Sequence, residues 1–111
     1  MHCLQSDEAW NFYDGDGVIV LYEFDLATGA VKTVQLGVNG TIAAPQYTVP
    51  ALTWVGALLD SRATWVLTGS ANTPAFDPRD STMAADNKTF VAELYRLFPA
   101  HGDLLHRLLE F

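Results

Sequence analysis

The sequence predicts an all-β sandwich or barrel followed by a short helical segment. Short apolar and β-branched runs recur over the first two-thirds of the chain, and turn-forming residues separate them roughly every 8–12 residues. The last third instead places apolar residues at helical spacing. Half of the residues are hydrophobic and 17% are charged, a composition that can form a hydrophobic core. The length of 111 residues is sufficient for one domain and too short for two. We therefore expect a single domain over 1–111, with strands mainly in 1–70, a loop over 71–88 and helices over 89–111.

The predicted strands begin with an aromatic-rich run, Ala9 to Tyr13, which stops at the turn cluster Asp14-Gly15-Asp16-Gly17. Val18 to Phe24 opens with four consecutive apolar residues, which is typical of a strand buried on both faces. A hairpin connection at Thr28-Gly29 then leads into an alternating stretch, Val31 to Leu36. The remaining predicted strands are Gln46 to Val49, Thr53 to Leu59 and Thr64 to Gly69.

The C-terminal third has a different pattern. Ala71 to Asp80 is rich in proline and aspartate, which predicts a loop. Thr89 to Leu97 has its apolar residues at helical spacing, and either Asp86 or Asn87 is suited to cap its start. Asp103 to Leu109 gathers leucines on one side and predicts a second helix.

Charge and cysteine content exclude several classes of protein. Acidic residues outnumber Lys and Arg by 13 to 6, so the formal charge of −7 argues against nucleic acid and against an anionic membrane as partners. Cys3 is the only cysteine, which excludes an intrachain disulfide. The first residues lack the basic flank and apolar stretch of a secretory signal, and no apolar run is long enough to span a bilayer. We expect a cytoplasmic protein.

One spacing near the start suggests metal chemistry. His2 is followed by Leu4 two residues later, by Glu8 four residues after that, and by Gly15. This resembles the first motif of the cupin superfamily, with Leu4 in the place of its second histidine. Residues two apart on a strand point to the same side, so two imidazoles and a carboxylate can bind one divalent ion.

The resemblance is closest to the "cupin 5" branch, a domain of unknown function. It extends over essentially the whole chain, and the matching segments are Ser6 to Asp16, Leu36-Gly37, Val49 to Trp54, Gly69 with Pro74 to Asp77, and Phe98-Pro99 with His101. The resemblance implies a cupin-type jelly-roll β-barrel. It also implies that the chain lacks the family's opening strands, which would leave His2 near a terminus that can fray and leave strand edges for another chain to cover.

Several positions depart from the family's pattern. Leu4 and Val55 stand at two of the four expected metal-ligand positions, and only His2 and Glu8 remain as potential ligands. Two ligands do not complete a metal site, so the sequence predicts no definite cofactor. A divalent metal stays an option, with an incomplete ligand set. Ala75 and Leu52 replace two turn glycines of the family.

These residues give a short set of site candidates. His2 and Glu8 are the candidates for catalysis and the weak candidates for metal binding, while Trp10, Asn11 and Trp54 are candidates for lining a ligand pocket. The alternative interpretation is structural: a terminal histidine, a structural carboxylate, aromatic side chains in the core and an asparagine on a solvent-facing surface. Trp54 is also expected to be architectural.

We expect a protein that binds a small molecule in the barrel cavity. One alternative is a degenerate sugar-nucleotide epimerase or isomerase, or a metal-dependent cupin enzyme. Another is a non-catalytic domain completed by strand exchange in a dimer. The expected partners are a small-molecule ligand and a second copy of the chain, with no nucleic acid and no membrane.

Overall fold

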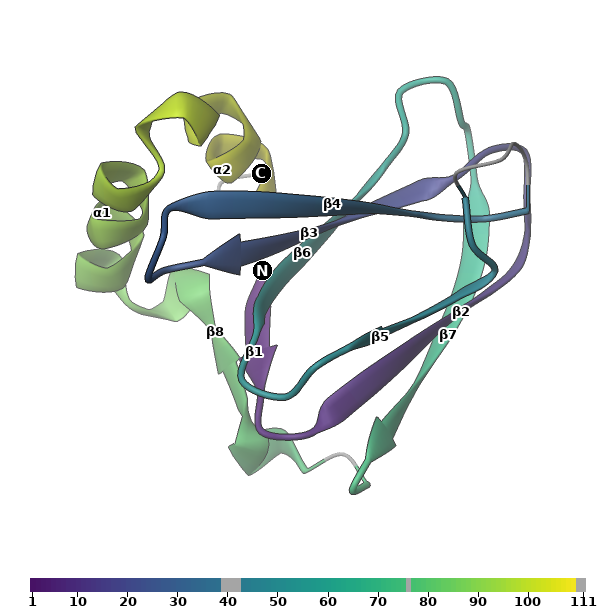
Figure 1. The fold of residues 1–111 in the computed structure, drawn as a ribbon, viewed down its shortest axis with the longest axis horizontal. Helices are drawn as coiled ribbons and strands as arrows, with labels where there is room; N and C mark the ends of the chain where they lie inside the picture. The colour runs from purple at the N-terminus through teal and green to yellow at the C-terminus, as the bar shows by residue number, and fades with distance from the viewer. Residues whose placement is uncertain (39–42, 76, 110–111) are drawn as a thin grey trace.

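The computed structural model describes residues 1–38, 43–75 and 77–109. In these residues the chain folds into two β-sheets followed by two C-terminal helices (Figure 1). The five-stranded sheet has the order β4-β3-β6-β1-β8, and the three-stranded sheet has the order β5-β2-β7. The strands are β1 (His2–Leu4), β2 (Asp7–Gly15), β3 (Ile19–Asp25), β4 (Ala30–Leu36), β5 (Gln46–Val49), β6 (Trp54–Leu59), β7 (Val66–Thr73) and β8 (Ser81–Met83). The predicted class, mainly β with C-terminal helices, is confirmed. Phe76 and residues 110–111, which fall in the predicted loop and the predicted helical segment, lie outside the described residues.

The six strands expected from the sequence correspond to β2 through β7. Their alternation and their turn signals are strong because each strand has one face toward a core. The prediction for β7 ended at Gly69, whereas the strand continues to Thr73 because β2 pairs with it along almost its whole length. A β-bulge interrupts that pairing between Phe12 and Asp14.

The central strand β3 is covered on both faces, as its apolar run predicts. Leu21 is fully buried in a small cluster between the sheets, together with Val49 and Val55. Phe24 points to the opposite face and meets Phe98 edge to face, with ring centroids 5.2 Å apart. The inner face of the five-stranded sheet therefore packs on the other sheet, and its outer face packs on the helical segment.

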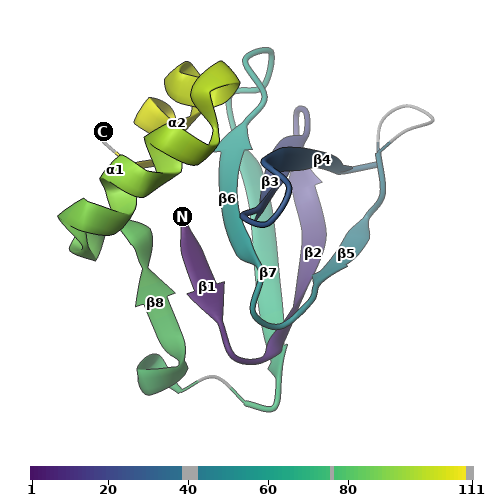
Figure 2. The ribbon, with the colours of Figure 1, turned by 60° about the vertical axis from the view of Figure 1, so that its left-hand side comes forward.

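Helices α1 (Lys88–Leu97) and α2 (Gly102–Leu109) lie on the outer face of the five-stranded sheet (Figure 2). Of the two capping candidates, Asn87 is the N-cap, because its side chain accepts a hydrogen bond from the backbone N–H of Phe90 at 3.1 Å. Leu94 and Leu105 are fully buried in the cluster that joins the helices to the sheet. The helices thus cover the face away from the interior of the sandwich.

Strands β1 and β8 were not expected. His2 pairs with Val55 of β6 on one side and with Met83 of β8 on the other, so the expected frayed terminus is instead a strand hydrogen-bonded along both edges. Strand β8 lies inside the segment 71–88 that was predicted as a loop, between two short 3₁₀ turns, Pro78–Asp80 and Ala84–Asp86. A three-residue strand carries too little pattern for recognition, and only its pairing with β1 makes it extended.

The two sheets form a sandwich that is open along its edges. Within the described ranges no strand belongs to both sheets, and an isolated bridge between Leu36 and Ala44 joins β4 to the segment that leads into β5. Strands β4 and β8 are the edges of one sheet, and β5 and β7 are the edges of the other. Among the same residues, no helix has the length and apolar character needed to cross a bilayer.

Candidate functional site

Three of the predicted site residues meet between the two sheets. His2 projects inward from β1, and Glu8 and Trp10 project inward from the same face of β2. The His2 Nε2 atom lies 3.3 Å from Glu8 Oε1, and the Trp10 indole Nε1 donates to the same oxygen at 3.0 Å. One carboxylate oxygen therefore connects a strand of each sheet.

The carboxyl group of Glu8 is adapted to stay ionised. The residue is only 8% exposed, and burial by itself would raise its pKa. The hydrogen bond with His2 and the electrostatic interaction with its ring, together with hydrogen bonds from Trp10 and Ser70, outweigh burial and hold the pKa of Glu8 below its ordinary value. A carboxylate held in this state is poorly suited to act as a general acid.

The residues around this cluster do not fit a metal ion. Of the four positions that correspond to cupin metal ligands, Leu4 and Val55 are buried apolar side chains, and the remaining two, His2 and Glu8, contact each other. No group of three or more His, Cys, Asp or Glu side chains in residues 1–38, 43–75 and 77–109 is arranged to hold a metal. The described side chains around His2 and Glu8 also leave no space that would admit a water molecule.

Asn11 and Trp54 lie elsewhere. Asn11 follows Trp10 on β2 and therefore faces the opposite side of the sheet, where its side-chain oxygen accepts from Gln46 Nε2 at 3.0 Å. Trp54 precedes Val55 on β6 and faces the helices, with its ring centroid 4.6 Å from that of Phe90. The five candidates therefore form one cluster of three residues and two separate positions.

A second polar cluster, which was not predicted, lies farther along the same inner face. Glu23 on β3 stands directly opposite Lys32 on β4, and Tyr47 reaches both from β5 of the other sheet. The Tyr47 hydroxyl donates to Glu23 Oε1 at 2.7 Å and accepts from Lys32 Nζ at 3.2 Å. Val55 pairs with both Glu23 and His2, so this buried valine separates the two clusters.

The charges in the second cluster reinforce one another. Burial, with the hydrogen bond that Tyr47 donates to Glu23, raises the pKa of the Tyr47 phenol, so it stays protonated and remains a donor. The hydrogen bond to Tyr47, together with the negative charge of Glu23, raises the pKa of Lys32. The Lys32 ammonium also lies 5.3 Å from the centroid of the Tyr47 ring. Side chains alternate between the two faces of the β3–β4 hairpin, and this alternation could have indicated the Glu23–Lys32 pair from the sequence. Nothing in the sequence predicts that Tyr47 joins the two residues.

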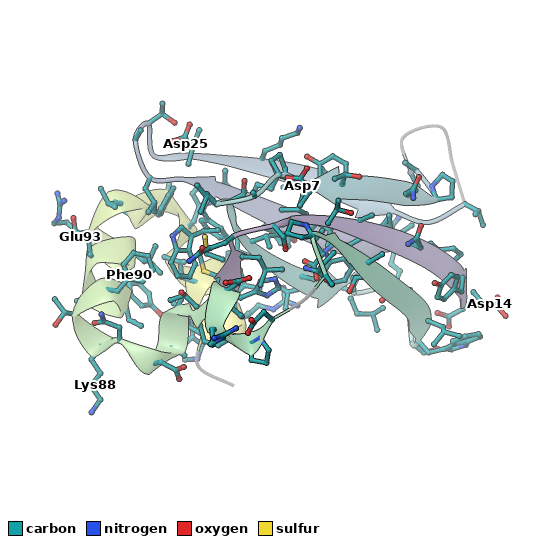
Figure 3. The ribbon with its side chains drawn as sticks, turned by 90° about the horizontal axis from the view of Figure 1, so that it is seen from below. Asp7, Asp14, Asp25, Lys88, Phe90 and Glu93 are labelled. Atoms are coloured by element: carbon teal, nitrogen blue, oxygen red, sulfur yellow. The ribbon has the colours of Figure 1, made fainter. Side chains whose placement is uncertain are left out.

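The second cluster borders a groove of about 570 Å³ at one end of the sandwich. The groove lies between the β3–β4 hairpin and the turn that leads into β6, and its walls include Glu23, Asp25, Leu26, Lys32, Leu52 and Trp54. In Figure 3, Asp25 marks this end of the molecule and Asp14 marks the far end of β2. Leu52 is 72% exposed and has a φ of 63°, in the region that favours glycine, which agrees with its place at a family glycine. Thr53 borders both this groove and the filled space around His2.

Comparisons with known proteins agree with this architecture. Residues 1–84 match the Cupin_5 family, which is described as cupin superfamily (DUF985). The fold is similar to that of a Shewanella oneidensis protein solved by X-ray crystallography, with a TM-score of 0.78, 25% identity, and coverage of 96% of this chain and 63% of that chain. It is also similar to a hypothetical protein from Leishmania major, with a TM-score of 0.73, 23% identity, and coverage of 96% and 66%. The chain spans less than two-thirds of the length of either solved protein, and none of the curated proteins matches it in sequence.

The family match extends across both sheets, since β8 ends at Met83. It includes His2 and Glu8 of the first motif as well as the Glu23, Lys32 and Tyr47 cluster. The resemblance inferred from the sequence is confirmed, and the chain belongs to the Cupin_5 (DUF985) family of the cupin superfamily.

Proposed function

We propose that this chain is a small-molecule-binding domain and that its ligand lies in the groove at the end of the sandwich. The observation that carries the proposal is the groove itself, whose volume of about 570 Å³ is within the usual range for ligand sites. Its walls combine apolar side chains such as Trp54 with a few converging polar groups, among them Glu23 and Lys32. Such a combination is typical of sites that orient a small organic ligand.

The interior around His2 supports this choice of place. The His2 and Trp10 side chains both bind one oxygen of the Glu8 carboxylate, and the space around His2 and Glu8 is filled. A ligand there would have to displace this buried network and leave a charge without partners, which is costly. The groove binds a ligand without that loss.

The arrangement gives less support to catalysis. An epimerase or isomerase of the type considered above needs a base and an acid on the two sides of one substrate. The two pairs that contain such groups, His2 with Glu8 and Tyr47 with Glu23, are on either side of the buried Val55. Binding without chemistry is therefore the function that we propose.

A fragment screen by NMR on ¹⁵N-labelled protein tests the proposal. Ala30 is exposed and lines the groove, so the substitution Ala30→Trp fills the site without touching the core. Ala92→Trp, at an exposed position of α1, is the matched control. We expect fragments that shift the amide resonances of the groove, with the shifts abolished by Ala30→Trp and kept by Ala92→Trp. A library that yields no hit in the groove, or hits that Ala30→Trp leaves unchanged, contradicts the proposal.

The open edges of the sandwich favour one further property, a homodimer completed by strand addition. Strand β7 is an eight-residue edge, and among the described residues it pairs only with β2. Long unpaired edges are sites for pairing with another chain. Light scattering coupled to size-exclusion chromatography is expected to give the mass of a dimer. A monomer at all concentrations, with a cooperative melt, contradicts this property and leaves the groove unaffected.

A further inference from the structure

We propose that the ligand of the groove is a zwitterion of the amino-acid type, with a carboxylate and an ammonium group on one carbon and an apolar side chain. This inference rests on the proposed function and specifies the chemistry of its ligand. Three properties of the groove carry it: a cation, two carboxylates along one strand, and an apolar wall.

The cation and one carboxylate stand side by side on neighbouring strands. Lys32 and Glu23 are directly opposite in the register of β4 and β3, and both line the groove. The Tyr47 hydroxyl connects them, because it accepts from Lys32 Nζ and donates to Glu23 Oε1. This connection fixes the positions of two opposite charges that flexible side chains would otherwise leave unordered.

Both charged groups keep capacity for a ligand. An ammonium group has three N–H donors, and Tyr47 uses one of those of Lys32. Glu23 receives the Tyr47 hydroxyl on Oε1, and within the described part of the chain its Oε2 accepts no other hydrogen bond. A ligand carboxylate therefore finds donors at Lys32, and a ligand ammonium finds an acceptor at Glu23.

Asp25 adds a second carboxylate on the hairpin side of the groove. Its Oδ1 is occupied by the hairpin, where it accepts from the backbone N–H of Ala27 at 2.9 Å and of Thr28 at 3.3 Å. These bonds hold the side chain in place at the groove wall. The groove thus carries two carboxylates, and both favour a ligand ammonium group electrostatically.

The apolar wall completes the match. Leu26, Leu52 and Trp54 line the groove beside the charged groups, and Leu52 is unusually exposed for a leucine. A purely anionic ligand would meet Glu23 and Asp25, and a purely cationic ligand would meet Lys32. A zwitterion with an apolar side chain is the ligand that has a favourable partner at each wall.

Three probes with one branched carbon skeleton test this inference. L-Leucine carries both charges, 3-methylbutylamine lacks the carboxylate, and 4-methylpentanoate lacks the ammonium group. Titrations followed by NMR are expected to show leucine shifting the groove amides with an affinity about tenfold higher than that of either partial probe. The same titrations on Lys32→Met should make leucine no better than 3-methylbutylamine, and on Glu23→Gln no better than 4-methylpentanoate. Lys88→Met and Glu93→Gln, on α1, are the matched controls and should bind leucine like the unsubstituted chain.

The outcomes separate this inference from the proposed function. Equal affinity for leucine and a partial probe, or unchanged leucine binding by Lys32→Met and Glu23→Gln, overturns the zwitterion. If the fragment screen gives groove hits while none of the three probes shifts the groove amides at millimolar concentration, the zwitterion is overturned and the proposed function stands. If neither fragments nor probes bind in the groove, both are overturned.

Discussion

Trp10 and Glu8 are joined side chain to side chain on one face of β2, with the indole Nε1 donating to Glu8 Oε1 at 3.0 Å. The same oxygen contacts His2 of the other sheet. Two residues at the positions of a metal-binding motif thus form a structural connection between the sheets, in which the carboxylate is the shared acceptor. The first prediction concerns the ionisation of this acceptor.

Replacing Glu8 with Gln is expected to reduce stability at neutral pH by about 1 kcal/mol, because the charged acceptor strengthens its hydrogen bonds. The pKa of Glu8 is lower in the folded state than its ordinary value of 4.5. The stabilisation by its charge is therefore fully present above pH 4.5 and is lost as the pH falls through the depressed folded-state pKa. Urea unfolding of both proteins at several pH values between 7 and 3 should show the difference in free energy narrowing at the acidic end. A difference that stays constant down to pH 3 contradicts this account of Glu8.

Replacing Trp54 with Ala is expected to destabilise the fold by about 3 kcal/mol, because it removes the ring that packs on Phe90 and on the helical cluster. Trp65 is the matched control, since its side chain is 50% exposed and lies outside both core clusters formed by the described residues. Trp65→Ala should change the free energy of unfolding by less than about 1 kcal/mol. Similar losses for the two variants would show that Trp54 does not anchor the helices.

The N-cap of α1 makes a third prediction. Asn87→Ala removes the acceptor for the Phe90 N–H and is expected to cost about 1 kcal/mol, whereas Asn87→Ser retains a capping oxygen and most of the stability. Asp86→Ala is the control at the neighbouring position. Thermal and urea unfolding measure the effect. A loss for Asp86→Ala as large as that for Asn87→Ala would move the cap to the other residue.

Leu52 provides a test of backbone conformation. Because its φ is 63°, a Cβ atom is unfavourable at this position, and the side chain is 72% exposed, so it contributes little packing. We expect Leu52→Gly to be more stable than Leu52→Ala by about 1 kcal/mol, since Gly alone relieves the left-handed conformation. Equal stability of the two variants in urea would show that the turn changes conformation in solution.

The strands with a strong hydrophobic pattern could be predicted from the sequence, and the strands without such a pattern could not. Val18 to Phe24 predicts β3 because its apolar run matches a strand between two cores. Ser81–Met83 has no such pattern, and its extended conformation depends on pairing with β1, which is distant in sequence. Short strands of this kind are determined by tertiary pairing rather than by local preference.

The candidate site shows the same division. Successive side chains of a strand face opposite sides of the sheet. On β2 this places Glu8 and Trp10 on one face and Asn11 on the other. On β6 it places Trp54 on the face opposite to that of the inward-facing Val55. Applied to each candidate, that rule would have divided the predicted pocket correctly. The Tyr47 hydroxyl, in contrast, meets Glu23 only because two sheets pack face to face, so no local pattern in the sequence contains the second cluster.

The pairing of β1 with β8 has a consequence for how the chain folds. His2 meets Met83, so a strand at the start of the described chain acquires its second neighbour from residues that follow all the other strands. This contact closes a very long loop. Its entropic cost grows only slowly with loop length, but contacts of such high sequence separation slow folding. We therefore expect the five-stranded sheet to assemble from the β3–β4 hairpin outward, and β8 to join the sheet last.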